Sequence, residues 1–232
     1  MSMSDAVTPF YPVQISCGMC QSSYKTMQIR SRFLRVKEVH ADFSRTFKDP
    51  SIDPLLYEVS VCSKCGYAST ATFLPVRKAD VIERFAEEAA SKWEPRDFGG
   101  ERTEIQAVHC WKLALYCASF SEQPHAVTAG AALKLHWMLQ RTAEGETENG
   151  RFLRLAASEY EASYMSGDFQ DTDMDELTLL FLLGETNRQL EEAQKAGTYF
   201  SKIFQHKEKD LHPALVERAR EQWQETRTTS KA

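Results

Sequence analysis

Two Cys-x-x-Cys pairs constrain the fold of this chain of 232 residues more than any other feature. The first pair spans residues 17–20 (CGMC) and the second spans residues 62–65 (CSKC). Each such turn directs two sulfur atoms to one side, and two turns from neighbouring hairpins complete a tetrahedral site. We therefore expect one metal ion bound by Cys17, Cys20, Cys62 and Cys65.

The expected ion is zinc, and iron in a rubredoxin-like site is the alternative. Four sulfurs close the coordination shell, so the site should stabilise the structure rather than perform catalysis. Gly66, directly after Cys65, and Gly18, inside the first pair, should relax the backbone of the two turns. A dithiol redox pair is less consistent with the sequence, because neither pair has a convincing helix behind it.

The sequence also sets expectations about the compartment. It contains no run of eighteen apolar residues, which excludes a membrane-spanning helix, and its start has no basic segment followed by an apolar one. We expect a cytoplasmic protein. Structural disulfides are rare there, so paired cysteines in a cytoplasmic chain usually bind metal.

Net charge and the spacing of apolar residues both change near residue 78. Residues 1–78 carry a net charge of +4 and read as strands and turns, whereas residues 79–232 carry −9 and have a helical period. The sequence therefore predicts an α+β protein with two domains. A small zinc-ribbon-like β module covers 1–78, and a mainly α-helical, tetratricopeptide-like domain covers 79–229.

Seven helices are expected in the second part. The second opens with Thr103 and Gln106 in capping-box spacing, and the fifth is expected to start at Asp173. Residues 182–204 have the order of small and aromatic residues found in a tetratricopeptide hairpin. The fifth helix is expected to carry Leu177, Leu180 and Gly184, and the other expected ranges are about 79–93, 103–120, 125–142, 149–166, 191–205 and 213–227.

The segment 24–48 suggests an alternative function. It is rich in lysine and arginine, interleaved with aromatic residues, and such a mixture on a zinc-stabilised sheet could follow a nucleic-acid backbone. A solvated strand face is the simpler interpretation, since the whole chain is acidic. The nucleic-acid alternative depends on Arg30, Arg32 and Arg35.

Signatures of catalysis are missing. No phosphate-binding loop, dinucleotide-binding glycine motif, metalloprotease motif or nucleophile elbow occurs. His109 and Cys110 are adjacent, but neighbours in a helix point about 100° apart, so adjacency does not make them a catalytic dyad. Cys110 and Cys117 are expected to be small apolar core residues. A non-enzymatic role is expected, and a catalytic site assembled between helices stays open.

The stretch "CGMC…RSRFLRV…HADF…IDPLLYEVSVCSKCGYA", followed by "LLGETNRQLEEAQKAGTYFSKI", resembles the bacterial domain-of-unknown-function family numbered 2225. The resemblance covers nearly the whole chain and implies a fold and a metal, but no activity. The first pair of that family usually reads Cys-Pro-x-Cys, and Gly18 stands in that place here. The matching residues are Cys17, Cys20, Pro54, Tyr57, Cys62, Cys65, Gly66 and Tyr67.

These observations together favour a zinc-binding protein that acts as a scaffold for a protein or peptide partner. Grooves between helical hairpins accept helices or extended peptides. The sequence does not identify the partner.

Overall fold

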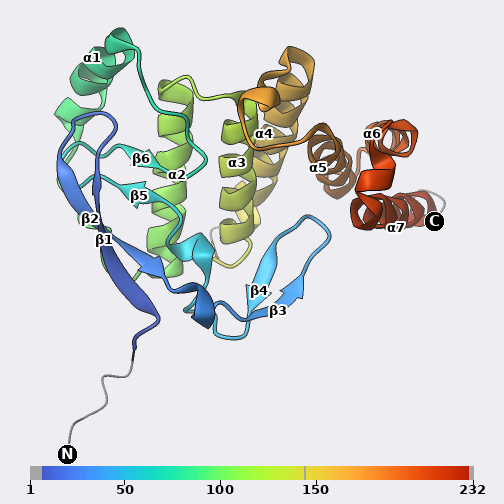
Figure 1. The fold of residues 1–232 in the computed structure, drawn as a ribbon, viewed down its shortest axis with the longest axis horizontal. Coiled ribbons are helices and arrows are strands. Elements are labelled where there is room, and N and C mark those ends of the chain that lie inside the picture. Colours follow the sequence, from blue (N-terminus) through green and yellow to red (C-terminus); the bar gives the residue numbers. More distant parts are fainter. Residues whose placement is uncertain (1–6, 144, 230–232) are drawn as a thin grey trace, which may run out of the picture. The chain divides into compact units, whose positions relative to one another are not determined.

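The computed structural model describes residues 7–143 and 145–229 and shows a mixed α+β protein, as expected (Figure 1). Short antiparallel hairpins come first along the chain and helices follow. The chain forms two compact units, which are described separately below. Among the described residues, unit 1 comprises 7–39 and 45–121, and unit 2 comprises 40–44, 122–143 and 145–229.

The strands pair as three separate hairpins, all antiparallel. The longest hairpin has seven residues in each strand, from Phe10 opposite Ile29 to Ser16 opposite Ser23. The described strands are β1 (Phe10–Ser16), β2 (Ser23–Ile29), β3 (Val36–Val39), β4 (Arg45–Phe47), β5 (Ser60–Val61) and β6 (Ala68–Ser69).

Seven α-helices occur in the described residues, and short 3-10 turns lie between some of them. The helices are α1 (Ala79–Glu88), α2 (Glu104–Phe120), α3 (His125–Leu139), α4 (Gly145–Ser166), α5 (Glu176–Gln189), α6 (Ala193–Gln205) and α7 (Pro213–Thr229).

Helix α2 forms the centre of unit 1. The expected capping box is present at its start, where Thr103 and Gln106 exchange side-chain and backbone hydrogen bonds. Trp111 is 1% exposed, and its Nε1 donates to the carbonyl of Leu55 at 2.9 Å. Cys117 accepts a hydrogen bond from the Ala68 N–H at 3.3 Å. The helix is thereby fixed to the loop before the second cysteine pair and to the strand after it.

Arg102, just before α2, is buried, and its guanidinium bonds backbone carbonyls rather than a carboxylate. Nε donates to Phe98 at 2.8 Å, and Nη1 donates to Leu56 at 3.2 Å and to Val59 at 2.7 Å. Burial lowers the pKa of the guanidinium. The side chain satisfies carbonyls of the loop 56–59 that would otherwise be buried without donors.

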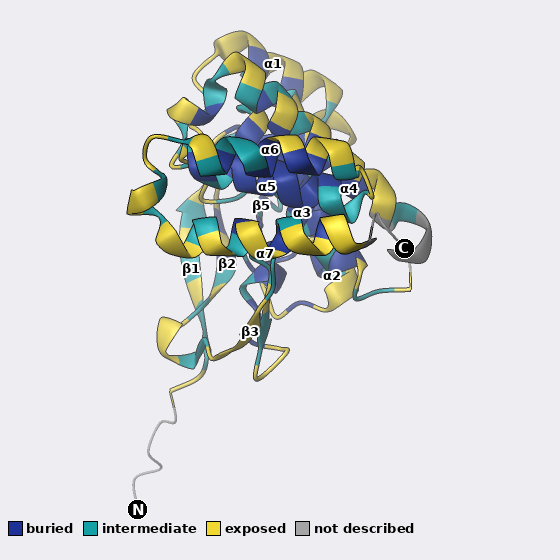
Figure 2. Cartoon of the chain, turned by 90° about the vertical axis from the view of Figure 1, so that its right-hand side faces the viewer, coloured by how far each residue is buried: buried dark blue, intermediate teal, exposed yellow. Residues whose placement is uncertain are grey.

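In unit 2, successive helices from α3 to α7 contact one another along the chain. Small residues allow the closest approaches. A Cβ atom at Gly184 of α5 would lie 2.5 Å from Phe200 of α6, and one at Gly197 of α6 would lie 1.9 Å from Trp223 of α7. Figure 2 shows α5 mostly in the buried colour, whereas α6 and α7 present exposed residues on their outer sides.

The start of α5 differs from the expectation. Its N-cap is Asp175, which accepts from the Thr178 N–H at 2.7 Å, rather than Asp173. Asp168, seven residues before Asp175, accepts from the His125 N–H at 2.7 Å and so caps the start of α3. The contact of Asp168 joins residues far apart in the chain, so local spacing cannot reveal it.

The boundary between the two units near residue 121 does not coincide with the change in composition at residue 78. Helices α1 and α2 belong to unit 1 with the strands, because the apolar face of α2 contacts β6 and the 3-10 turn at 54–56. The boundary at 78 marks where the strand pattern ends and the helical period begins. It is not where the chain separates into compact bodies.

Among the described residues, no helix combines the length and the apolarity that crossing a lipid bilayer would need.

Candidate metal centre

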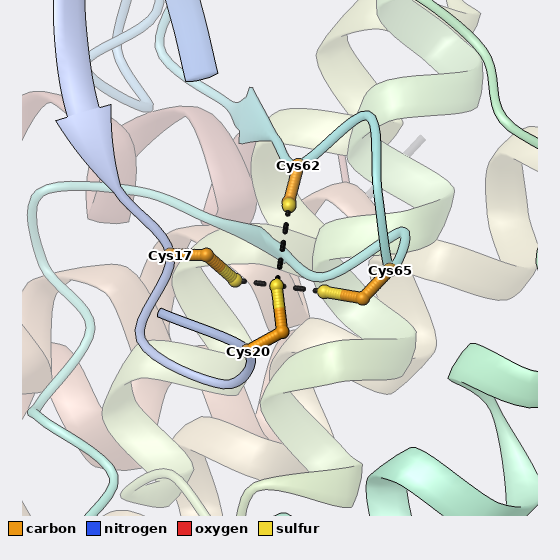
Figure 3. Close-up of side chains that lie close together, drawn as sticks. All are labelled: Cys17, Cys20, Cys62 and Cys65. Carbon is orange, nitrogen blue, oxygen red and sulfur yellow. Dashed lines mark hydrogen bonds between the residues drawn. The ribbon is translucent and has the colours of Figure 1, made fainter. Parts of the chain in front are cut away.

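Two loops bring the four cysteines of the paired motifs together. One follows β1 and carries Cys17 and Cys20; the other follows β5 and carries Cys62 and Cys65. Figure 3 shows the sulfur atoms of both loops converging on one point. All four lie within 4.8 Å of one another, and no other group of three or more potential ligands occurs in the described part of the chain.

The sulfur separations fit a tetrahedral metal site. Cys17 Sγ lies 3.5 Å from Cys65 Sγ, and Cys20 Sγ lies 3.7 Å from Cys62 Sγ. Zinc–sulfur bonds of about 2.3 Å place neighbouring sulfurs of a tetrahedron about 3.8 Å apart. A disulfide would need about 2.0 Å, so these distances belong to free cysteines. The donor set therefore fits a single ion.

The two loops use the same backbone hydrogen bonds. The Cys17 N–H donates to the Ser22 carbonyl, and the Gln21 N–H donates to the Cys17 carbonyl. The Cys62 N–H donates to the Tyr67 carbonyl in the same way, and the Gly66 N–H donates to the Cys62 carbonyl. The motifs are thus two copies of one turn, each presenting a pair of sulfurs.

The position after the second cysteine is left-handed in both copies. Gly66 has φ +76°, and Gln21 has φ +59°. The expectation for Gly66 is therefore confirmed. The expectation that Gly18 relaxes the first turn in the same way is wrong, because Gly18 is not among the residues with positive φ. The left-handed residue of the first turn is Gln21, three positions later.

Aromatic side chains cover the second turn. Trp93 packs on Gly66, where a Cβ atom would lie 2.4 Å from the indole ring, and its Nε1 donates to the Ser63 carbonyl at 3.0 Å. Tyr67 is buried and meets Phe85 of α1 edge-on, with 5.6 Å between ring centroids. The turn is thereby held against α1 and the segment that follows it.

The site also contains donors for thiolate sulfur. The Met19 N–H lies 3.4 Å from Cys17 Sγ. Backbone N–H groups that lower the pKa of the thiols come from Met19 and Cys20 at Cys17, from Lys64 and Cys65 at Cys62, and from Tyr67 at Cys65. Such donors disperse the negative charge of thiolate ligands, as expected in a metal site.

Without an ion, the four sulfurs cannot all be ionised. The hydrogen bond from Cys65 lowers the pKa of Cys17 to about 5. The same hydrogen bond and burial raise the pKa of Cys65, and burial raises that of Cys62. A divalent cation would replace the shared proton and stabilise all four thiolates. Binding should therefore release protons.

Exposure at the site is small. Cys17, Cys62 and Cys65 are at most 4% exposed, and only Cys20 is half-buried. Because four sulfurs fill a tetrahedral shell, the geometry leaves no position for a substrate. The arrangement can hold a structural ion, and the sulfur distances suit zinc and iron alike.

The arginines of the nucleic-acid alternative lie in the connection between β2 and β3. All three, Arg30, Arg32 and Arg35, are exposed. Arg30 lies over the ring of Tyr11 at 4.7 Å, and Arg32 lies over the ring of Phe33 at 5.0 Å. The segment 24–48 is not one continuous sheet face, since β2 and β3 belong to different hairpins.

The remaining cysteines lie apart from the cluster. Cys110 is 0% and Cys117 is 1% exposed, and burial raises the pKa of Cys110 to about 11 and that of Cys117 to about 12. Both are core thiols, as expected. His109 is exposed, so it does not share the environment of Cys110.

Sequence reasoning missed Gln21 and Trp93 as parts of the centre. A clue to Gln21 was available, because it occupies the same place after its pair as Gly66 does. Trp93 gave no local signal, since it contacts the second turn from 27 residues further along the chain than Gly66.

The sequence matches the model of one protein family. The profile of DUF2225, described as "Uncharacterized protein conserved in bacteria", matches residues 10–226. No curated protein and no solved structure matches the chain.

Proposed function

The chain belongs to the DUF2225 family, and from this premise we propose that it is a non-enzymatic zinc protein that serves as a scaffold for a protein or peptide partner. The observation that carries the proposal is the closed set of four sulfurs. An ion held by four thiolates has no free coordination position, so its contribution is to stability. Helical hairpins then supply the surface on which a partner binds.

The order of chain segments supports this assignment of roles. The two cysteine turns are the ends of small hairpins, and isolated two-stranded hairpins are only marginally stable in water. Binding of an ion would tie both turns together and supply part of the folding free energy of unit 1. In unit 2, close approaches at Gly184 and Gly197 resemble those that small residues make in tetratricopeptide hairpins.

The test is partner capture with a matched metal-free variant. Wild type and Cys62→Ser, both tagged, are exposed to a bacterial lysate, and any candidate is purified and titrated against each protein. We expect a partner that binds the purified wild type. If repeated captures with wild type and Cys62→Ser yield no protein that binds the purified chain, the scaffold proposal is wrong.

A nucleic-acid-binding role is the second candidate. The observation that favours it is the exposure of Arg30, Arg32 and Arg35 within six residues, beside the aromatic rings of Tyr11 and Phe33. Phosphate contacts make affinity fall with salt. Titration of single- and double-stranded DNA and RNA at low salt, with the triple alanine variant as control, decides it. A flat titration of the wild type would eliminate this role.

A further inference from the structure

Residues 40–44 are a short loop that belongs to the helical unit although the strands on either side, β3 and β4, belong to unit 1. We call residues 40–44 the tip. Its contacts come from helices that follow it in sequence by about a hundred residues or more. The tip is therefore bound to the helical unit by contacts with helices distant in sequence.

Asp42 is the polar anchor of the tip and is 8% exposed. Its Oδ2 accepts from Trp137 Nε1 of α3 at 2.7 Å and from Gln189 Nε2 of α5 at 3.4 Å. Its Oδ1 accepts from the N–H and the hydroxyl of Ser44 at 3.0 and 2.6 Å. A carboxylate is thus bound through donors from two helices, a geometry that would select an acidic residue in any ligand.

A cationic group lies nearby but is already paired. Arg188 of α5 forms a bidentate pair with Glu185, and its pKa is raised by that hydrogen bond first and least by the charge of Asp42. Glu185 also accepts from Gln189 Nε2 at 2.9 Å, so it offsets the positive charge of Arg188 beside the tip. The preference for an acidic residue therefore depends on the hydrogen bonds to Asp42, which a carboxylate accepts more strongly than a neutral amide.

Phe43 is the apolar anchor. Its ring lies 4.9 Å from that of Phe181 of α5, and Arg218 of α7 lies 5.0 Å above it. An aromatic ring that contacts a second ring and a guanidinium is stabilised by ring–ring and cation–π attraction.

The tip is held by these contacts rather than by its own hairpin. All four residues of β3 are exposed, and β4 has only three residues. A two-stranded hairpin with no buried face is marginally stable. Phe43 also has φ +68°, a conformation that disfavours a residue with a large side chain. Exposed strands and a strained anchor make the tip suited to release.

We propose that α3, α5 and α7 form a binding site for a peptide of a partner protein in which an acidic residue precedes an aromatic one, and that the tip fills this site as an internal ligand. The proposal rests on the scaffold function and specifies the chemistry of the partner. A partner peptide displaces Asp42 and Phe43 and takes over their contacts with Trp137, Gln189 and Phe181.

The test uses the full chain and a labelled synthetic peptide with the sequence of residues 36–48. The vacated variant is Asp42→Ser with Phe43→Ser, and the matched control is Lys37→Ser with Arg45→Ser, which changes two exposed residues of the same hairpin. A tethered segment competes at an effective concentration of order millimolar. The vacated variant should therefore bind the peptide about a hundred-fold more tightly than wild type or the control.

Two altered peptides test the chemistry. Asn in place of Asp42 should weaken binding to the vacated variant about ten-fold or more, and so should Ala in place of Phe43. Adding Trp137→Phe to the vacated variant should reduce the advantage of Asp over Asn. Equal binding of all peptides would overturn the assignment of the two anchors.

Other outcomes also decide the proposal. Equal binding by wild type and the vacated variant, or no binding by a vacated variant that keeps its helical circular dichroism, overturns it. Dimers of wild type that disappear in the vacated variant would show that the occupant is a second copy. If the vacated variant loses helix content, Asp42→Asn alone should still admit the peptide about ten-fold more tightly than wild type. Failure of lysate capture would leave these results unaffected.

Discussion

Gln21 and Gly66 occupy the same position in two copies of one turn. Each follows the second cysteine of its pair, lies in the left-handed region, and donates its N–H to the carbonyl of the first cysteine. Only Gly66 has the residue type that such a φ favours, and only Gly66 is covered by Trp93. The two turns therefore share a geometry but differ in how much side chain they tolerate.

Gly66→Ala should destabilise unit 1 by about 2–4 kcal/mol, because the left-handed conformation costs about 1–2 kcal/mol for alanine and the new Cβ atom would overlap Trp93. Metal affinity should fall with it. Thermal unfolding and a competition titration with a chelator measure the two effects.

The matched control for that variant is Gln21→Gly, which relieves the same φ where no tryptophan intervenes. Its stability should be unchanged or higher by up to about 1 kcal/mol, since the relieved strain is offset by a more flexible unfolded chain. Gly18→Ala should be tolerated, because its Cβ atom would lie 3.7 Å from Tyr67. Destabilisation by Gln21→Gly as large as that by Gly66→Ala would contradict the equivalence of the turns.

Cys62→Ser should lower the metal content from about one ion per chain to a small fraction, because serine replaces a thiolate at a site with four ligands. Unit 1 should lose stability, as should the wild type after chelation. Elemental analysis of protein purified without added metal measures the content and identifies zinc or iron.

Cys110→Ala is the control for the metal prediction. Cys110 is as buried as the ligands but lies outside the cluster, so its removal should leave the metal content unchanged. Wild type that contains neither zinc nor iron would refute the metal centre, and a loss of metal in Cys110→Ala would refute the assignment of the four ligands.

Alkaline pH should reduce the stability of unit 1 through its core thiols. Burial raises the pKa of Cys110 from 9.0 to about 11, so the folded state favours the neutral thiol. The stability gained from keeping the Cys110 thiol neutral is fully present below pH 9 and is lost as the pH rises toward 11. At pH 11 the free energy of unfolding should be lower by about 2 kcal/mol for this reason. Denaturant unfolding of wild type and Cys110→Ala at pH 8 and pH 11 should show a smaller decrease in the variant. Equal decreases would refute the prediction.

In the helical unit, Gly197→Ala should destabilise by about 1–3 kcal/mol or more, because the Cβ atom would overlap Trp223. Gly130→Ala in α3 is the control, since its Cβ atom meets nothing nearer than 4.0 Å. Alanine there should stabilise the helix by about 0.5–1 kcal/mol. Thermal unfolding followed by circular dichroism should show a lower melting temperature for Gly197→Ala and a higher one for Gly130→Ala. A change in the same direction for both variants would contradict the packing described.

The clustering of the four cysteines and the helices could be predicted because their signals are local. Cysteine spacing identifies the four sulfurs, and the capping box at Thr103 marks the start of α2. The order of small and aromatic residues in 182–204 predicts a pair of packed helices, and Gly184 of α5 does lie against Phe200 of α6.

What could not be predicted depends on residues far apart in the chain. Asp168 caps a helix that begins 43 residues before it, and Trp93 covers a turn formed by a different segment. Asp42 lies in the basic segment 24–48, where nothing in the local sequence marks it, yet its carboxylate accepts hydrogen bonds from two helices. Pattern analysis of neighbouring residues contains no information on such pairs.

The place of Asp42 in the helical unit affects how the chain folds during synthesis. Asp42 leaves the ribosome 95 residues before Trp137 and 147 residues before Gln189. Contacts that close such long loops form late and slow folding. All residues of unit 1 have been synthesised once α2 is complete. Unit 2, in contrast, includes residues 40–44, which are synthesised long before the helices that they contact. The first unit should therefore complete its fold on the nascent chain, and the second should complete its fold only after α7 has been synthesised.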